Sequence, residues 1–312
     1  MKTCLHCYQP LSGNEADFHA SCSKKIFGLP IPPILPYSET ELEPLAKQII
    51  QSQTAVTGVQ AKLSLHITGE SSEQRRFTIV GLWGGYILKP PAQHYPQLPE
   101  VEDLTMHLAS IAKINTAPRS LIRLASGNLA YITKRMDRTS KGKLAMEDMC
   151  QLTERLTEDK YHGSYEQIGR TIQKYSATPG LDLVNFWEIV LFSFVTGNAD
   201  MHLKNFSLLE KPGLGMTFSP AYDLVNTALV NPADSEEMAL TLHGKKKKLK
   251  KQDFTAAMSI FKMDEKQQQN IFKKIEKAFP KWTALIQNSF LTEEFKKKYQ
   301  YILEERLNRL QS

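Results

Sequence analysis

The sequence lacks any hydrophobic run long enough to cross a membrane, and it contains only four cysteines. A membrane-spanning helix needs roughly 18 consecutive apolar residues. The longest apolar region, Phe186 to Val195, is interrupted by Glu188 and Ser193. The first residues, MKTCLHCYQP, also lack the apolar core of a secretory signal. We therefore expect a soluble, cytoplasmic protein that makes no membrane contact and whose cysteines stay reduced.

Charge is nearly balanced, with 39 basic and 33 acidic residues and a net charge of +6. Much of the excess lies in one run, Lys245 to Lys251, which could bind nucleic acid, an acidic protein or phospholipid. Nucleic-acid strands are commonly bound by basic residues interleaved with aromatic ones, and this run contains no aromatic residue. We also recognise no helix-turn-helix pattern. A solvated turn is the favoured interpretation, without direct sequence-specific binding of nucleic acid.

Three regions of different character follow one another along the chain. Residues 1–28 hold three of the four cysteines, and the prolines of the next segment, LPIPPILP, favour an extended connector. Residues 29–136 are rich in strand patterns and residues 137–312 in helical patterns. We expect helices at residues 39–52 and 100–111, and strands at 77–80, 85–89, 119–124 and 129–134, with the β-rich region starting near Thr57.

The most informative segment reads GNADMHLKNFSLL and, after a glycine turn, PAYDLV. Asp200 stands five residues before Asn205, and Asp223 follows 18 residues later. Phosphoryl transfer needs one carboxylate to accept a hydroxyl proton, and an amide with a second carboxylate to hold Mg²⁺. The three residues fit these roles. Capping and turn residues in a loop would give the same short pattern. The motifs elsewhere in the sequence therefore decide between the catalytic and the structural interpretation.

Those surroundings resemble the HipA-like kinases, the toxins of bacterial toxin–antitoxin modules. NADMHLKNFS followed by YDL is similar to the signature of this family. Other motifs match in the correct order: GVQAK at 58–62, ILK at 87–89, VEDLTMHLA at 101–109, TKRMDR at 133–138 and EDMCQ at 147–151. The resemblance implies an α+β, protein-kinase-like two-lobed fold. We expect a head at 1–28, an antiparallel-sheet N-lobe at 29–136 and a helical C-lobe at 137–312, with ATP between the lobes.

The resemblance also implies a role for each matching residue. Asp200 is the expected catalytic base, Lys204 is expected to neutralise the transferred phosphoryl group, and Asn205 with Asp223 is expected to bind Mg²⁺. The residues expected to contact ATP or to order its site are Gly58, Gln60, Lys62, Lys89, Glu102, Lys134, Met136, Asp137 and His202. Lys89 would meet the phosphates while Glu102 orients it by an ion pair. Surface placement of Lys89 and simple core packing of His202 are the alternatives.

The loop around Gly58 is rich in hydroxyl groups, at Ser52, Thr54 and Thr57. In the family, a serine of the corresponding loop is autophosphorylated, and the modified loop leaves the ATP site and silences the enzyme. A phosphate adds about −2 of charge and favours a basic pocket over the nucleotide site. We expect autophosphorylation at one of these three residues, although they could be ordinary turn residues.

The head carries the pattern Cys4-x-x-Cys7 followed by His19-x-x-Cys22. Two paired ligands of this kind suit tetrahedral zinc, and a bound ion would give a short segment the energy to fold. Packing of the same residues against the N-lobe is the alternative. His6 is a substitute ligand, and Cys150 is expected in the core.

We therefore expect an ATP- and Mg²⁺-dependent protein serine/threonine kinase with a possible zinc site. The resemblance implies a toxin of the short, HipT-like form without the N-terminal subdomain of long relatives. Expected partners are a protein of translation such as an aminoacyl-tRNA synthetase as substrate, a small HipS-like protein and a DNA-binding HipB-like antitoxin. The alternative is a non-catalytic or small-molecule-directed protein of the same fold.

Overall fold

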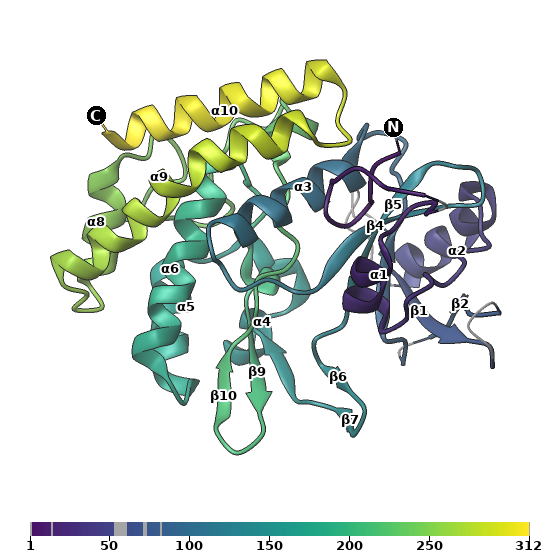
Figure 1. The fold of residues 1–312 in the computed structure, drawn as a ribbon. Helices are drawn as coiled ribbons and strands as arrows, with labels where there is room; N and C mark the ends of the chain where they lie inside the picture. Colours follow the sequence, from purple (N-terminus) through teal and green to yellow (C-terminus); the bar gives the residue numbers. More distant parts are fainter. Residues whose placement is uncertain (1, 14, 53–60, 71–73, 82, 312) are drawn as a thin grey trace. The chain divides into compact units, whose positions relative to one another are not determined.

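The computed structural model describes residues 2–13, 15–52, 61–70, 74–81 and 83–311, with the backbone alone for residues 46–52. The chain divides into two compact units (Figure 1). We call them the sheet unit, made of Met1–Asp103, Ala117–Arg138 and Asn288–Phe290, and the helical unit, made of Leu104–Thr116, Thr139–Gln287 and Leu291–Ser312. Both units therefore combine segments that are distant in sequence.

The sheet unit is built on an antiparallel five-stranded sheet with the strand order β2-β1-β3-β5-β4. Its strands are β1 (Leu63–Thr68), β2 (Arg76–Ile79), β3 (Tyr86–Lys89), β4 (Arg119–Arg123) and β5 (Leu129–Lys134). Leu88 lies opposite both Leu63 and Ile132, and all three side chains are fully buried. Because side chains alternate between the faces of a strand, this register gives the sheet an apolar face for the core. The four predicted strands are confirmed to within one residue at each end.

Three helices accompany the sheet: α1 (Ala20–Phe27), α2 (Glu39–Ser52) and α3 (Leu98–Ile111), of which α3 continues into the helical unit after Asp103. The head that contains α1 shares the core of the sheet, through edge-to-face ring contacts. The ring centroids are 5.4 Å apart for Phe18 and Phe27, 5.8 Å for Phe27 and Phe77, and 5.3 Å for Phe77 and Tyr86. The predicted boundary at residue 28 thus falls within one hydrophobic core, and the predicted helices at 39–52 and 100–111 are present.

The connector of residues 29–36 runs beside β2, the edge strand. The amide of Ile34 donates to the carbonyl of Arg75 at 3.0 Å, and its carbonyl accepts from the amide of Phe77 at 2.8 Å. These bonds form a parallel bridge between Ile34 and Arg76. The prolines on either side limit the pairing to this one residue, since a proline has no N–H to donate.

The helical unit contains most of the described helices and a small antiparallel sheet, and a two-stranded sheet begins at Arg138, the last residue of a segment of the sheet unit. Its helices are α4 (Met149–Leu152), η1 (Thr157–Tyr161), α5 (Tyr165–Tyr175), α6 (Pro179–Val195), η2 (Leu203–Asn205), α7 (Thr227–Val230), α8 (Lys251–Ser259), α9 (Glu265–Gln287) and α10 (Glu293–Gln311). One sheet has the order β10-β9-β8, from β8 (Met146–Asp148), β9 (Ser207–Lys211) and β10 (Gly215–Phe218); the other pairs β6 (Arg138–Thr139) with β7 (Gly142–Lys143).

Helix α6 is the centre of this unit. Every residue from Phe186 to Val195 is buried, including Glu188, whose carboxylate pairs with Lys274 of α9. The prediction of a core helix here is confirmed. Among the described residues, no helix combines the length and the apolar character that a membrane span requires.

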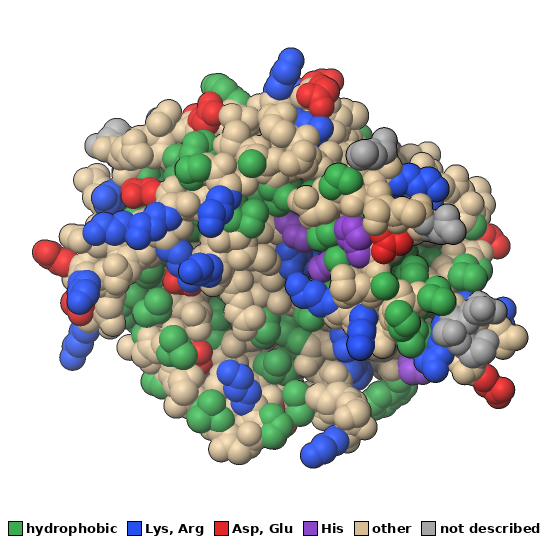
Figure 2. All heavy atoms as spheres, in the orientation of Figure 1, with side chains coloured by type: hydrophobic (Ala, Val, Ile, Leu, Met, Phe, Trp, Pro, Cys, Tyr) green, Lys and Arg blue, Asp and Glu red, His purple; other side chains and the backbone are tan. Residues whose placement is uncertain are grey.

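The lysine run occupies the loop before α8 and the first residue of that helix, and several of its side chains contact other residues of the helical unit. The ammonium of Lys245 donates to buried Asp253 at 2.8 Å, and that of Lys247 donates to Ser235 at 2.6 Å. The Lys251 ammonium lies 5.1 Å from the ring centroid of Phe272. Figure 2 shows that several Lys and Arg side chains on the drawn face lie beside acidic ones. These contacts give the run a structural role.

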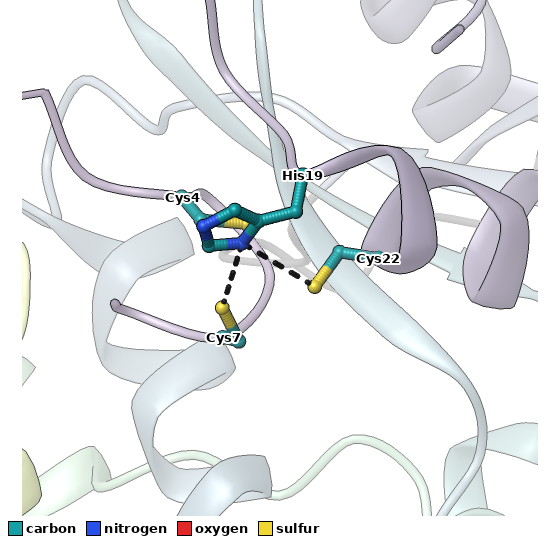
Figure 3. A group of neighbouring side chains, drawn as sticks. All are labelled: Cys4, Cys7, His19 and Cys22. Carbon is teal, nitrogen blue, oxygen red and sulfur yellow. Dashed lines mark hydrogen bonds between the residues drawn. The ribbon is translucent and has the colours of Figure 1, made fainter. Parts of the chain in front are cut away.

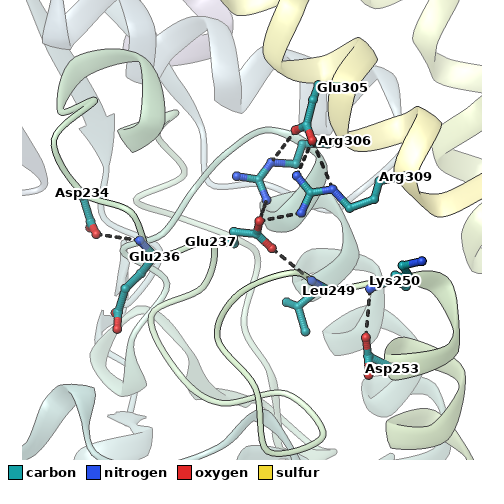
Figure 4. Close-up of polar contacts among 9 residues, drawn as sticks. All are labelled: Asp234, Glu236, Glu237, Leu249, Lys250, Asp253, Glu305, Arg306 and Arg309. Carbon is teal, nitrogen blue, oxygen red and sulfur yellow. Dashed lines mark hydrogen bonds and ion pairs between the residues drawn. The ribbon is translucent and has the colours of Figure 1, made fainter.

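The same loop is attached to α10 through Glu237 (Figure 4). Its carboxylate accepts from the amide of Leu249 at 3.2 Å and pairs with Arg306 at 3.1 Å. Arg309 makes a further ion pair with it. The loop that contains the lysine run is therefore held by a half-buried cluster of charges.

Candidate functional site

The segment that was predicted to carry out phosphoryl transfer occupies the loop that follows α6. Gly197 ends the helix in the left-handed region, at φ +67°, and an added Cβ there would lie 3.0 Å from Asn226 Oδ1 and from Ile302. Only glycine adopts this conformation without strain. The fully buried Asn198 then fixes the next turn, because its Oδ1 accepts from the amide of Asp200 at 3.1 Å.

This loop brings Asp200 and Asn205 together. The Nδ2 group of Asn205 donates to the carbonyl of Asp200 at 2.9 Å, and the amide of His202 donates to the same carbonyl at 2.8 Å. Asn205 and His202 are buried, whereas Asp200 is half-buried. One side-chain bond, from Asn205, and one main-chain bond, from His202, thus hold the loop closed. Both use the carbonyl of Asp200 and leave its carboxylate accessible.

Tyr161 of η1 is a site residue that sequence reasoning missed. Its hydroxyl donates to Asp200 Oδ1 at 2.6 Å, and its ring meets that of His202 edge-to-face, with centroids 5.0 Å apart. Burial of the phenol and the negative charge of Asp200 raise the pKa of Tyr161. The phenol therefore stays protonated and remains a hydrogen-bond donor to the carboxylate. A single tyrosine 39 residues away carries no local signal that could have found it.

Lys204 makes an ion pair with Asp148, with 2.7 Å between Nζ and Oδ2. Asp148 is also the N-cap of α4, where it forms a capping box with Gln151. The segment EDMCQ therefore has a structural role, because its Asp148 orients Lys204. Cys150 of the same segment is buried, as predicted.

Asp223 lies in a turn with φ +55° and is half-buried. The preceding residue links this turn to the loop: the Tyr222 hydroxyl lies 3.0 Å from the carbonyl oxygen of Lys204 and 2.5 Å from Ser207 Oγ. Burial raises the pKa of Tyr222, so the phenol remains protonated. The segment that contains Asp223 is thus attached to the segment that contains Asn205.

The sheet unit contains the predicted lysine and glutamate pair. Lys89 ends β3, Glu102 lies on α3, and Lys89 Nζ is 2.5 Å from Glu102 Oε1. Both side chains are almost completely buried, with 4% and 2% exposed. The ammonium also lies 5.3 Å from the ring centroid of Tyr131. A buried pair of this kind fixes the lysine in one orientation.

The predicted hinge follows β5. Lys134 is its last residue, and the carboxylate of buried Asp137 accepts from Arg135 at 3.0 Å through each of its oxygens and also pairs with Arg138. Burial alone would raise the pKa of Asp137, but the two arginines outweigh it and lower the pKa. Asp137 thus serves as a charged anchor for the turn that follows Met136.

Several predicted residues fall outside what the structure describes. These are Thr54, Thr57, Gly58 and Gln60, together with the side chain of Ser52. Lys62, the last residue before β1, is described and is exposed. The glycine-containing loop and its phosphorylation sites therefore remain predictions from the sequence.

The four predicted ligands of the head form a cluster (Figure 3). Their ligand atoms all lie within 4.8 Å of one another, and His19 Nδ1 is 3.3 Å from Cys7 Sγ and 3.8 Å from Cys22 Sγ. A tetrahedral zinc ion with Zn–S of about 2.3 Å and Zn–N of about 2.0 Å holds its ligand atoms roughly 3.5 to 3.8 Å apart. Cys4 completes the set. The donor types, and the two distances from His19 Nδ1, are therefore close to those of a zinc site.

The surroundings of the cluster support the same conclusion. His19 Nε2 lies 3.0 Å from the carbonyl of Pro10, which assigns the proton to Nε2 and leaves Nδ1 as a ligand, as at many metal sites. Burial and the neighbouring Cys4 raise the pKa of Cys22 to about 12, so a bound cation would be needed to ionise this thiol at neutral pH. His6 is not part of the cluster; its Nδ1 lies 3.2 Å from the carbonyl of Arg119.

Comparison with known proteins places these features in a family. The profile of the HipA-like C-terminal domain matches residues 54–283. The chain belongs to the HipA-like family. An inferred kinase of Sinorhizobium fredii, Y4dM, is 32% identical over 185 residues, which are 55% of this chain and 45% of that protein. An inferred kinase of Haemophilus influenzae is 27% identical over 248 residues, 73% of this chain and 69% of that one. The chain spans about half the length of the Sinorhizobium relatives.

Solved structures confirm the predicted kinase-like α+β fold. HipA from the Shewanella oneidensis toxin–antitoxin complex of HipA, HipB and operator DNA aligns with a TM-score of 0.71 and 21% identity, over 85% of this chain and 71% of that one. The Helicobacter pylori proinflammatory kinase CtkA aligns with a TM-score of 0.52 and 14% identity, over 72% of this chain and 87% of that one. At these identities, the HipA-like chain shares a fold with both proteins.

Proposed function

We propose that this HipA-like chain is an ATP-dependent protein serine/threonine kinase and acts as the toxin of a toxin–antitoxin module. The observation that supports the proposal is the loop after α6, where hydrogen bonds hold Asp200 close to Asn205; phosphoryl transfer uses an acid and an amide of this kind as base and metal ligand. The similarity to inferred kinases supports the reaction class.

In this mechanism Asp200 accepts the proton of the acceptor hydroxyl. The hydrogen bond from Tyr161 to Oδ1 restricts rotation of the carboxylate, so that Oδ2 would meet the substrate. The Lys204 ammonium, oriented by Asp148, would neutralise negative charge on the transferred phosphoryl group. General bases contribute about 10²- to 10⁴-fold to rate, and only when they are held within hydrogen-bond reach.

The metal and nucleotide roles follow from the atoms that each residue offers. Asn205 uses its Nδ2 group to hold the Asp200 carbonyl, which leaves its amide oxygen, with the Asp223 carboxylate, as a hard ligand for Mg²⁺. When bound, Mg²⁺ supplies charge neutralisation of the phosphate oxygens. Lys89, oriented by Glu102, would contact the phosphates, and main-chain groups of Lys134 and Met136 would contact adenine. Asp137, which pairs with Arg135 and Arg138, would contact the ribose.

Regulation and partners extend the proposal. Phosphorylation of Ser52, Thr54 or Thr57 would add about −2 of charge to the loop before β1 and disfavour its placement beside ATP phosphates. Proposed partners are a translation protein such as an aminoacyl-tRNA synthetase as substrate, a HipB-like DNA-binding antitoxin and a small HipS-like protein. The Shewanella HipA structure is described as a complex with HipB and operator DNA, which supports the antitoxin.

We also propose that Cys4, Cys7, His19 and Cys22 bind one zinc ion. The support is the donor spacing and the tautomer set by Pro10. Three cysteines and one histidine form a closed structural site, with no position left for a substrate.

The proposed kinase activity is tested with labelled ATP and a cell lysate. Wild-type protein should label a protein, and Asp200→Asn should lower the rate by about 10²-fold or more while nucleotide affinity is largely kept. Glu276→Gln, a change at an exposed carboxylate in the same unit, is the matched control and should behave as wild type. Label on a small molecule, or binding of ATP without transfer, would favour the alternative of a small-molecule-directed or non-catalytic protein.

A further inference from the structure

The turn that carries Cys4 and Cys7 leads directly into Tyr8. The amide of Tyr8 donates to the Cys4 carbonyl at 3.0 Å, and the amide of Cys4 donates to the Gln9 carbonyl at 2.9 Å. Tyr8 has φ +62°, a conformation that a bulky residue keeps only when its surroundings enforce it. An ion bound by Cys4 and Cys7 would clamp this turn from both ends.

The side chain of Tyr8 extends from this turn to α3. Its hydroxyl donates to Asp103 Oδ2 at 2.7 Å, and both residues are buried. The ring packs edge-to-face on Phe290, with centroids 5.0 Å apart. A hydrogen bond to a buried carboxylate is strong and costly to lose. The head therefore holds one point of α3 firmly.

The residue next to that point is Glu102, the partner of Lys89. Consecutive residues of a helix move together, because the helical hydrogen bonds fix their relative positions. With Asp103 held by Tyr8, Glu102 is kept where its carboxylate lies 2.5 Å from Lys89 Nζ. In kinases the corresponding ion pair must be formed for catalysis.

The head is also attached to the sheet on the side of β4. The carbonyl of Leu5 accepts from Ser120 Oγ at 3.2 Å and from the Leu121 amide at 3.4 Å, and the amide of Leu5 donates to the Asp17 carbonyl at 2.8 Å. The metal-ligand turn is therefore fixed to the sheet as well as to α3. A change in the turn would be transmitted to the position of α3 relative to β3.

We propose that the Cys4, Cys7, His19 and Cys22 cluster binds a thiophilic divalent cation, zinc in the first instance, and that this ion positions Glu102 through Tyr8 and Asp103. The activity of the chain then depends on whether the head binds its metal ion, although none of the four ligands in the head is a catalytic residue. The proposal rests on the proposed kinase function for its consequence for activity, but the structural coupling can be measured without it.

The test uses the full chain with three readouts: zinc content by elemental analysis, hydrogen–deuterium exchange of α3, and phosphoryl transfer. Tyr8→Phe keeps the ring and all four ligands. We expect it to retain about one zinc and to increase exchange in the first turns of α3 by about tenfold, the factor expected for one buried hydrogen bond to a charged group. Its turnover should fall by a similar factor. Cys7→Ser should lose zinc and reproduce both effects.

Tyr86→Phe is the matched control, because it also removes a buried tyrosine hydroxyl of the sheet unit, one that donates to the Ile26 carbonyl at 3.2 Å. It should leave exchange in α3 and turnover at wild-type values. The coupling would be overturned if Tyr8→Phe bound zinc and still showed wild-type exchange in α3. It would also be overturned if metal-free wild type stayed folded and kept its full turnover. Absence of transfer in zinc-loaded wild type would instead refute the kinase function, while exchange in α3 would still decide the coupling.

Discussion

Breaking the buried pair of Lys89 and Glu102 should destabilise the protein and inactivate it for separate reasons. With 2% of the Glu102 side chain exposed, Lys89→Met leaves a carboxylate in the interior without the ammonium 2.5 Å away. Removing one partner of a buried ion pair typically costs about 3 to 5 kcal/mol. We expect the free energy of unfolding to fall by about this amount.

The double variant Lys89→Met with Glu102→Leu separates the two effects. Replacing both members of a buried pair by apolar residues is often neutral, and in favourable cases stabilising by about 1 to 4 kcal/mol. The double variant should therefore regain most of the stability that the single variant loses. Its phosphoryl transfer should stay absent, because the lysine that is proposed to contact the phosphates is missing.

Urea unfolding followed by circular dichroism, together with transfer from labelled ATP, measures both quantities. Lys113→Met is the control, since Lys113 is exposed and its loss should change stability by less than about 0.5 kcal/mol. Wild-type stability in Lys89→Met would refute the buried-charge reasoning. Substantial transfer by the double variant would refute the proposed role of Lys89 at the phosphates.

Three further predictions concern the helical unit and the loop before β1. Tyr161→Phe should lower turnover by about tenfold through loss of the bond to Asp200, and unchanged steady-state turnover would contradict this. Burial alone would raise the pKa of Asp253, but Lys245 and other donors lower it. The stability that ionised Asp253 contributes to the fold is therefore complete above about pH 4 and is lost at lower pH. The free energy of unfolding in urea should depend less on acid pH in Asp253→Asn than in wild type. Intact mass should show phosphate on wild type that is absent from Asp200→Asn, and phosphate mapped only far from residues 52–57 would contradict loop autophosphorylation.

The parts of the site that were predictable from sequence are those whose residues are close together in the chain. Asp200 and Asn205 belong to one loop, and the spacing of five residues already limits their separation. The four predicted metal ligands form two short pairs, and a common ion is the usual reason for such pairs. The alternation of apolar and polar residues in β1 likewise predicts a strand without reference to the rest of the fold.

Contacts between distant segments were not predictable in this way. The bond between Tyr161 and Asp200 spans 39 residues, and the ion pair of Lys204 with Asp148 spans 56. Each depends on how α5 and α6 pack and on the course of the chain between them, which no local pattern encodes. Tyr8 is a similar case, because its bond to Asp103 joins segments 95 residues apart.

The first 36 residues cover both outer strands of the five-stranded sheet. Ile34 pairs with β2, and the carbonyl of Leu5 accepts from the amide of Leu121 in β4. Uncovered edge strands offer unpaired amide and carbonyl groups to other chains and promote aggregation. A shortened chain that began after the connector would present both edges at once, so the head and the connector also protect the newly folded protein from intermolecular strand pairing.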